Sequence, residues 1–202
     1  MSKRSTVVVN LIIVCILTTI SVVVFTTNFN NVFLTVSAPL SNGNRQNQSI
    51  SFMVQLGGHT PYAEPLVDIF KERGVGATFF LDGGWATMNL SLLSTLASEF
   101  EIGNGGQDIL QTHKILGGIL DYPPTLFHPN QASVTRQLLR TAQSMGYTTV
   151  LPSQTNLNST TFRRGDLVLI TPCITTLATL PTLVDHFLTQ GYNIIPVGEI
   201  LV

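Results

Sequence analysis

From residue 50 to its end, the sequence repeats one unit about six times: a short apolar run followed by an amphipathic stretch. This alternation predicts strands that are each followed by a helix, and therefore a mostly parallel sheet with helices packed outside it. The runs ATFFL (residues 77–81) and DLVLI (residues 166–170) are almost continuously apolar, which is typical of parallel strands buried on both faces. The expected strands are residues 50–56, 77–81, 101–104, 125–128, 148–151, 167–171 and 193–197, and the expected helices are residues 61–73, 90–100, 107–120, 133–145 and 177–190.

About seven strands in roughly 150 residues leave two architectures open. One is a small and incomplete barrel, and the other is an open doubly wound sheet. In both architectures the functional groups collect at the carboxyl ends of the strands. Gly74 and Gly146 follow two of the expected helices, where glycine commonly ends a helix.

The first part of the chain has a different composition. Residues 7–25 are almost continuously apolar and follow the basic pair Lys3 and Arg4, and the next charged residue is Arg45. An apolar run of about 20 residues with a basic flank predicts a membrane-spanning helix whose N-terminus is cytoplasmic. A cleaved signal peptide is the alternative, with the small residues 36–38 as a cutting site. We therefore expect an anchor or signal segment at residues 1–27, a linker at residues 28–49 and an exported domain at residues 50–202.

The overall composition excludes several classes of protein. Hydrophobic residues make up 44% of the chain and charged residues 10%, whereas soluble domains carry roughly 25% charged residues. Disordered chains have the opposite composition. A net charge of -1 gives no basic excess to bind nucleic acid. Cys15 lies in the apolar segment and Cys173 in the exported part, so the two cannot pair within one chain, and Cys173 is expected to be a buried thiol.

Several segments of residues 50–202 follow one another in an order that a known family shares. The sequence LVDIFKERGVGATFFL at residues 66–81 matches a helix followed by a G-V-x-A-T-F-F strand, and FEIGN at residues 100–104 matches an H-E-I-G-N-H turn. Residues 124–129, 145–150, 165–170 and 190–197 match further segments of the same pattern. The chain thus resembles the polysaccharide deacetylase (NodB-homology) family. The resemblance implies a deformed (β/α) barrel.

The resemblance also implies a chemistry, which is the metal-assisted removal of acetyl groups from N-acetylated sugars. In the family, one Asp and two His hold a divalent metal such as zinc, which polarises the amide carbonyl and activates a water. A second Asp acts as the base, and a His late in the chain protonates the leaving amine.

The matching positions of this sequence carry none of these groups. A conserved Arg of the family pattern falls on His128, and only one of the two prolines that follow it remains, as Pro129. Without the metal ligands no bound water of lowered pKa can form. We therefore expect a degenerate member of the family that has no catalytic residues and no cofactor. The matching residues are Gln55 for the base, Leu56 for the metal-binding Asp, Gly105 and Ile109 for the two His, Thr155 for a later Asp and Thr171 for the late His.

A rebuilt metal site is the alternative. His59 and His128 follow expected strands, and Asp108 follows another, so the three side chains could share a zinc ion at the functional edge. Polar loop residues also collect at such an edge without binding a metal.

Aromatic residues at the same edge suggest a different role, which is stacking on sugar rings. The expected glycan contacts are Trp85, Tyr62 and His128, although Trp85 also fits a packing position.

Three functions follow from these expectations. The first is a membrane-tethered, extracytoplasmic, inactive deacetylase-like protein that binds N-acetylated cell-envelope glycan, or a partner protein, through the old substrate groove. The second is a divergent metal-dependent deacetylase, and the third is a structural envelope protein. A protein secreted after signal cleavage is the alternative to the anchored form.

Overall fold

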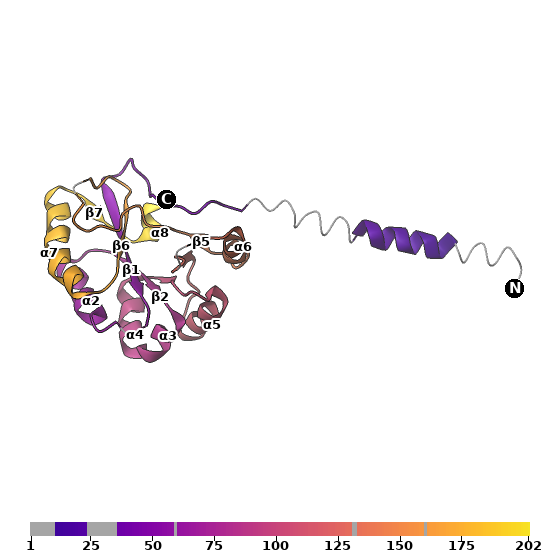
Figure 1. Cartoon of the computed structure of the whole chain (residues 1–202), viewed down its shortest axis with the longest axis horizontal. Helices are drawn as coiled ribbons and strands as arrows, with labels where there is room; N and C mark the ends of the chain where they lie inside the picture. The colour runs from indigo at the N-terminus through magenta and orange to yellow at the C-terminus, as the bar shows by residue number, and fades with distance from the viewer. Residues whose placement is uncertain (1–10, 24–35, 59, 131–132, 160) are drawn as a thin grey trace, which may run out of the picture. The chain divides into compact units, whose positions relative to one another are not determined.

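The computed structural model describes residues 11–23, 36–58, 60–130, 133–159 and 161–202 (Figure 1). The chain separates into two compact units, residues 1–36 and residues 37–202.

The N-terminal unit contains a helix over residues 11–23. The hydroxyl of Thr18 donates a hydrogen bond to the carbonyl of Cys15 at 2.9 Å, one turn earlier in the helix. None of the helices in the described ranges has both the length and the apolar character needed to cross a bilayer. The expected membrane segment, residues 7–25, extends into residues 1–10 and 24–35, which lie outside the described residues. The membrane anchor therefore stays a prediction.

The second unit is built around one parallel sheet, as the alternation of apolar runs predicts. The strands follow the order β5-β4-β3-β2-β1-β6, and β7 pairs with the beginning of β1. The ladders between neighbouring strands in this order are parallel, and β1 lies between β2 and β6. The strands are β1 Ser49–Leu56, β2 Thr78–Leu81, β3 Glu101–Asn104, β4 Leu126–Phe127, β5 Thr148–Thr149, β6 Leu167–Ile170 and β7 Asn193–Ile194.

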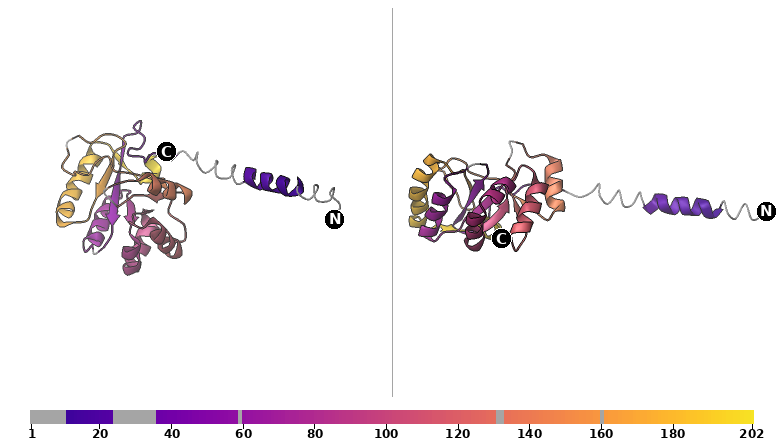
Figure 2. Two further views of the ribbon diagram at one scale, coloured as in Figure 1. Left: turned by 45° about the vertical axis from the view of Figure 1, so that its right-hand side comes forward. Right: turned by 90° about the horizontal axis from the view of Figure 1, so that it is seen from below.

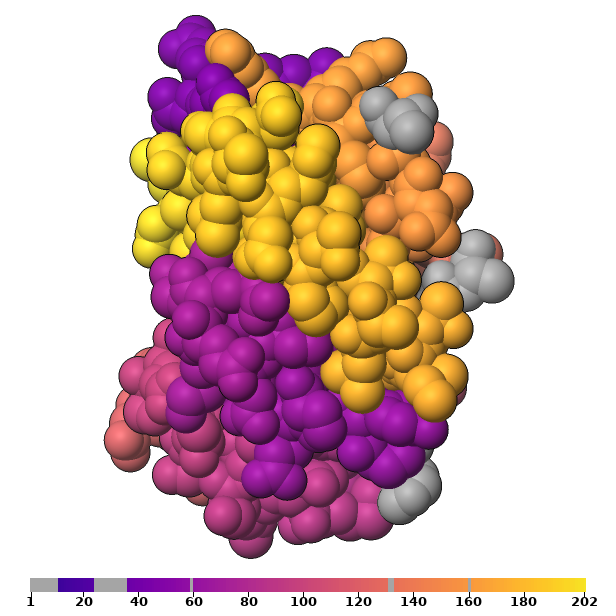
Figure 3. Space-filling model, turned by 90° about the vertical axis from the view of Figure 1, so that its left-hand side faces the viewer, coloured from indigo at the N-terminus to yellow at the C-terminus, as the bar shows by residue number. Residues whose placement is uncertain are grey.

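The helices form an arc around the strands (Figures 1 and 2). Figure 3 shows part of this outer layer, where α7 lies against α2. Gly74 ends α2 with a φ of 59°, as the sequence predicts, because glycine adopts this left-handed conformation readily. The helices are α2 Ala63–Arg73, α3 Gly83–Met88, α4 Leu90–Glu99, α5 Ile109–Ile119, α6 Arg136–Ser144, α7 Ile174–Thr189 and α8 Val197–Ile200.

The two faces of β1 belong to two different cores. Phe52 and Val54 point to the main core beneath the helices, whereas Met53 packs with Phe80 and Val197 in a smaller core on the concave side. This alternation follows from the two-residue period of a strand. The result is a parallel half-barrel with helices outside it, which confirms the expected type of barrel fold.

Three local predictions were wrong. Helix α3 was not expected, because its six residues begin with two glycines. The expected last strand, residues 193–197, ends at Ile194 and is followed by α8. Helix α7 begins at Ile174 rather than at residue 177. Its N-cap is Cys173, whose sulfur accepts from the Thr176 N–H, so Cys173 is exposed instead of buried.

The expected linker at residues 28–49 was also wrong in its second half. Residues 37–45, which we call the strap, lie along the domain, while residues 28–35 are outside the described residues. Leu40 forms a bridge with Val150, just after β5, and Asn42 forms a bridge with Asp166, just before β6. Because β5 and β6 are the two ends of the strand order, the strap joins the two edges of the sheet.

Candidate functional site

The carboxyl ends of β1 to β4 lie side by side and define one edge of the sheet. Asp82, Gly105 and His128 each follow a strand, and their backbone N–H groups donate to the last residue of β1, β2 and β3 respectively, each at 2.9 Å. The residues that follow neighbouring strands are thus held in a row by backbone hydrogen bonds. We call this row the strand-end edge, and it is where a parallel fold of this type places its functional groups.

Gln55 lies at this edge and matches the position of the catalytic base. The residue is 8% exposed, and its Nε2 donates to the carbonyl of Gly105 at 2.9 Å. Its Oε1 is buried and has no hydrogen-bond partner among the described residues. The amide therefore ties β1 to the end of β3, but it cannot take a proton at neutral pH.

Gly105 matches the first metal-binding His. A Cβ atom at this residue would lie 2.7 Å from the carbonyl carbon of Phe80 and 2.7 Å from Gln55 Nε2. Cβ atoms in proteins essentially never come this close to other heavy atoms. The position is therefore closed to a side chain by the backbone of β2 as well as by Gln55.

The other residues that match positions of the family's site do not form one group with Gln55. Leu56 is fully buried in the main core beneath the helices, on the opposite face of β1 from Met53. Ile109 packs with Phe127 in a third small core. Thr155 and Thr171 are exposed. These residues contain no carboxylate or imidazole, and two of them serve as core packing.

His128 is the titratable group that lies deepest at the edge, with 6% exposure. Its Nδ1 lies 3.1 Å from the carbonyl of Val150, which can only accept, so Nδ1 carries the proton and Nε2 is left as an acceptor. The ring also packs against Phe80, with ring centroids 5.5 Å apart. Burial lowers the pKa of His128 below its ordinary value of 6.5, because the charged form loses hydration. The imidazole is therefore neutral at pH 7.

A pH dependence of stability follows from His128. Below pH 6.5 the unfolded chain takes up a proton at this residue before the folded protein does, so the free energy of unfolding decreases as the pH falls. We expect His128→Asn, whose amide can still donate to Val150, to lose less stability than the wild type between pH 7.5 and pH 5. Urea unfolding at the two pH values measures the difference. The exposed His186 on α7 supplies the control variant His186→Asn, and equal pH slopes for wild type and His128→Asn would contradict the assignment.

The rebuilt metal site receives no support from the described residues. His59 lies outside them. Asp108 is the N-cap of α5, and its carboxylate accepts from the N–H of Gln111 at 3.0 Å. Within the described residues, no group of three or more His, Cys, Asp or Glu is arranged to hold a metal ion.

The expected sugar contact at Trp85 was wrong. Trp85 is 1% exposed and belongs to the main core, because the Asp82 cap starts α3 directly after β2 and turns the indole inward. Its ring has no free face for a sugar. Tyr62 is half-buried at the start of α2. The remaining aromatic group with an exposed ring on this domain's described surface is Tyr122, which follows α5.

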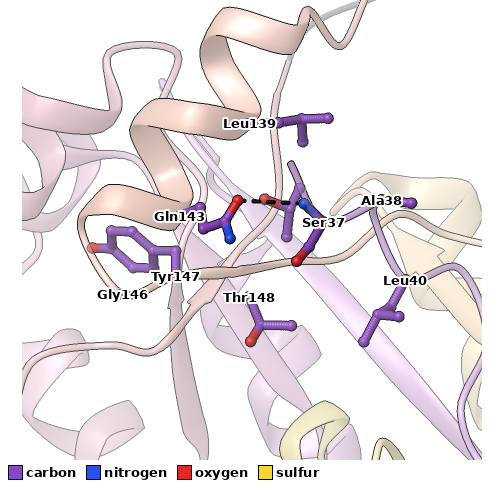
Figure 4. A pocket seen from close by; sticks show the side chains of 9 residues that line it. Ser37, Ala38, Leu40, Leu139, Gln143, Gly146, Tyr147 and Thr148 are labelled. Carbon is purple, nitrogen blue, oxygen red and sulfur yellow. Dashed lines mark hydrogen bonds between the residues drawn. The ribbon is translucent and has the colours of Figure 1, made fainter. Parts of the chain in front are cut away.

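A cavity of about 450 Å³ lies away from the strand-end row, between α6, β5 and the strap (Figure 4). The N–H of Ser37 donates to Gln143 Oε1 at 3.3 Å across its mouth. The cavity lining is a mixture of small, polar and apolar side chains without a charged group: Ser37, Ala38, Leu40, Leu139, Gln143, Gly146, Tyr147, Thr148 and Thr149. It marks where the strap meets the domain.

Comparison with solved structures identifies the class of fold. The chain has the fold of the CE4 carbohydrate esterases, the family of the polysaccharide deacetylases. One similar structure is a CE4 family pseudoenzyme from Bacillus anthracis, BA3943, with a TM-score of 0.76 and 19% identity over 82% of this chain and 69% of that one. Another is the family 4 carbohydrate esterase PdaA of Bacillus subtilis, with a TM-score of 0.71 and 16% identity over 80% of this chain and 84% of that one.

Sequence comparison gives a weaker signal. No protein-family model matches the chain. A Bacillus subtilis protein, the uncharacterized protein YlxY, is 22% identical over 192 residues, which cover 81% of this chain and 60% of that protein. The chain therefore spans less than two thirds of the length of this relative. The resemblance that the sequence motifs indicate is confirmed at the level of the fold.

Proposed function

We propose that the protein is a catalytically inactive, deacetylase-like domain that binds amino-sugar glycan of the cell envelope at the strand-end edge. One observation supports this proposal: the chain has the fold of the deacetylases, but other residues stand at the positions of their metal ligands and base. Leu56, Gly105 and Ile109 replace the three metal ligands, and Gln55 replaces the base, while the edge itself keeps buried polar groups. A solved protein of the same fold is itself described as a pseudoenzyme, which supports the inactive state.

The proposal places the domain outside the cytoplasm. Its support is the apolar segment at residues 7–25 with Lys3 and Arg4 in front of it, which fits an uncleaved anchor with its N-terminus inside. A domain tethered in this way would meet envelope glycan without diffusing away from the membrane.

A pull-down experiment tests glycan binding. We expect the full chain, purified in mild detergent, to be retained on insoluble peptidoglycan or on partly deacetylated chitin and to remain in solution with cellulose, which has no amino group. Absence of retention on both amino-sugar polymers would refute the binding function.

An acetyl-release assay tests the inactive state separately. With N-acetylglucosamine oligosaccharides and added zinc, we expect no acetate above the protein-free blank, because no described residue set can hold the metal. Release of acetate that depends on zinc and is lost in His59→Ala would favour the divergent deacetylase instead.

A further inference from the structure

The strand-end edge presents hydrogen-bond acceptors. Gln55 Oε1 is buried and unpaired, whereas the donor of the same amide, Nε2, already binds the carbonyl of Gly105. An unpaired buried acceptor is unfavourable, so a ligand that supplies a donor gains binding free energy there.

The imidazole of His128 has the same character. Because the Nδ1 proton of His128 binds the carbonyl of Val150, the free nitrogen of the ring is an acceptor. The backbone of Phe80 approaches Gly105, and its ring packs on His128, so a continuous set of contacts connects the Gln55 amide to the imidazole.

The formal charge beside these acceptors is negative. Asp82 directly follows β2, and Asp108 lies four residues after the end of β3. Each caps a helix with one carboxylate oxygen, Oδ1, in the described hydrogen bonds. A Cβ placed on Gly57, the residue after β1, would lie 3.4 Å from the Cβ of Asp82, so this carboxylate stands next to the end of β1.

We propose that this edge recognises glucosamine units whose amine is free and protonated, in preference to N-acetylated units. The inference rests on the proposed function and narrows its ligand. An ammonium group supplies three donors and a positive charge, which match the acceptors of Gln55 and His128 and the carboxylate of Asp82. An acetamide carbonyl needs a donor or a cation, and the positions that would hold the cation are Leu56, Gly105 and Ile109.

Binding requires a small rearrangement at Gln55. Its oxygen is covered in the ligand-free protein, so the flexible side chain rotates and exchanges its neutral bond to Gly105 for a bond to the ammonium group. Hydrogen bonds to a charged group are about twice as strong as neutral ones, which offsets the loss of the bond to Gly105.

Calorimetric titration of the full chain in mild detergent tests the preference, at pH 6.5 and physiological salt. The probes are the tetramer of glucosamine and the tetramer of N-acetylglucosamine. We expect the glucosamine tetramer to bind at least about tenfold more tightly, as one or two charge-assisted bonds provide.

Two substitutions test which side chains cause the preference for glucosamine. Gln55→Met keeps the shape but removes the acceptor, and we expect it to weaken glucosamine binding about tenfold. Asp82→Asn removes the charge and keeps a favoured helix cap, and it should weaken the same ligand several-fold. Ser51→Ala is the matched control, because Ser51 lies on the same face of β1 and also has a buried, unpaired oxygen, but far from the edge. Thermal unfolding verifies that each variant is folded.

The outcomes separate the two proposals. Tighter binding of glucosamine that falls in both site variants and not in Ser51→Ala supports the inference. Equal binding of the two tetramers, or preference for the N-acetylated one, overturns the inference and leaves glycan binding standing. Binding of neither tetramer, together with no retention on the insoluble polymers, overturns both.

Discussion

A chain that begins at residue 46 should unfold more easily than one that begins at residue 37, with a free energy of unfolding lower by about 4 kcal/mol. The shorter chain loses the strap, so the two edges of the sheet keep the bridge between Gln154 and Val168 but lose the bridges made by Leu40 and Asn42. Four backbone hydrogen bonds disappear, and each contributes about 1 kcal/mol. They are Leu40 N–H to Thr149 O, Leu151 N–H to Leu40 O, Gly43 N–H to Gly165 O and Asn44 N–H to Ile200 O, with lengths between 2.7 and 2.9 Å.

The packing of the strap supports a large effect. A Cβ on Gly43 would lie 2.6 Å from the carbonyl oxygen of Ile200, so the strap backbone rests directly on α8. Without the strap, β5 would also expose an unpaired edge, which promotes association between chains.

Urea unfolding of the two truncated chains, followed by circular dichroism, measures the difference. The chain that begins at residue 37 is the control, since it lacks the N-terminal unit but keeps the whole strap. Equal midpoints and equal slopes for the two chains would show that residues 37–45 are a linker after all.

The strap shows what could not be predicted from composition. Its sequence, SAPLSNGNR, is small and polar, which is also the composition of a linker. Its contacts with the sheet are made by backbone groups, and backbone hydrogen bonding leaves little trace in side-chain patterns. The strands themselves were predictable, because parallel strands buried on both faces must be continuously apolar.

The candidate site could also be predicted only in part. The loss of the metal ligands can be read from Leu56, Gly105 and Ile109 once the motifs are aligned. The burial of Trp85 could not be read in the same way, because it depends on a short helix that begins with two glycines. The hydrogen bond from Gln55 to Gly105 joins residues 50 positions apart, so only the fold reveals it.

The second large effect concerns Gly105. We expect Gly105→Ala to lower the free energy of unfolding by about 3 kcal/mol, the upper part of the range for overpacking a buried site. Gln55 can turn away from the new methyl group, but the carbonyl of Phe80, 2.7–2.8 Å from the added atom, belongs to the central part of the sheet and can move only with β2.

Gly117→Ala provides the matched control. Gly117 lies in α5, where an added Cβ meets no atom within 4 Å, and alanine there should stabilise the helix by about 0.5–1 kcal/mol. The two glycine substitutions should therefore have opposite signs in the same urea experiment. A Gly105→Ala variant as stable as the wild type would show that β2 and β3 can separate at this edge.

The short distance between a Cβ at residue 105 and the Phe80 backbone also affects any attempt to place the family's metal ligands in this chain. A mutant of the similar pseudoenzyme BA3943 is described as having restored enzymatic activity. In the present chain, a histidine at residue 105 carries the Cβ that collides with the Phe80 backbone. We expect the combined variant Gln55→Asp, Leu56→Asp, Gly105→His, Ile109→His to bind zinc poorly and to unfold at lower urea than the wild type. Stoichiometric zinc in a stably folded variant would show instead that the backbone at Gly105 leaves room for a metal-binding side chain.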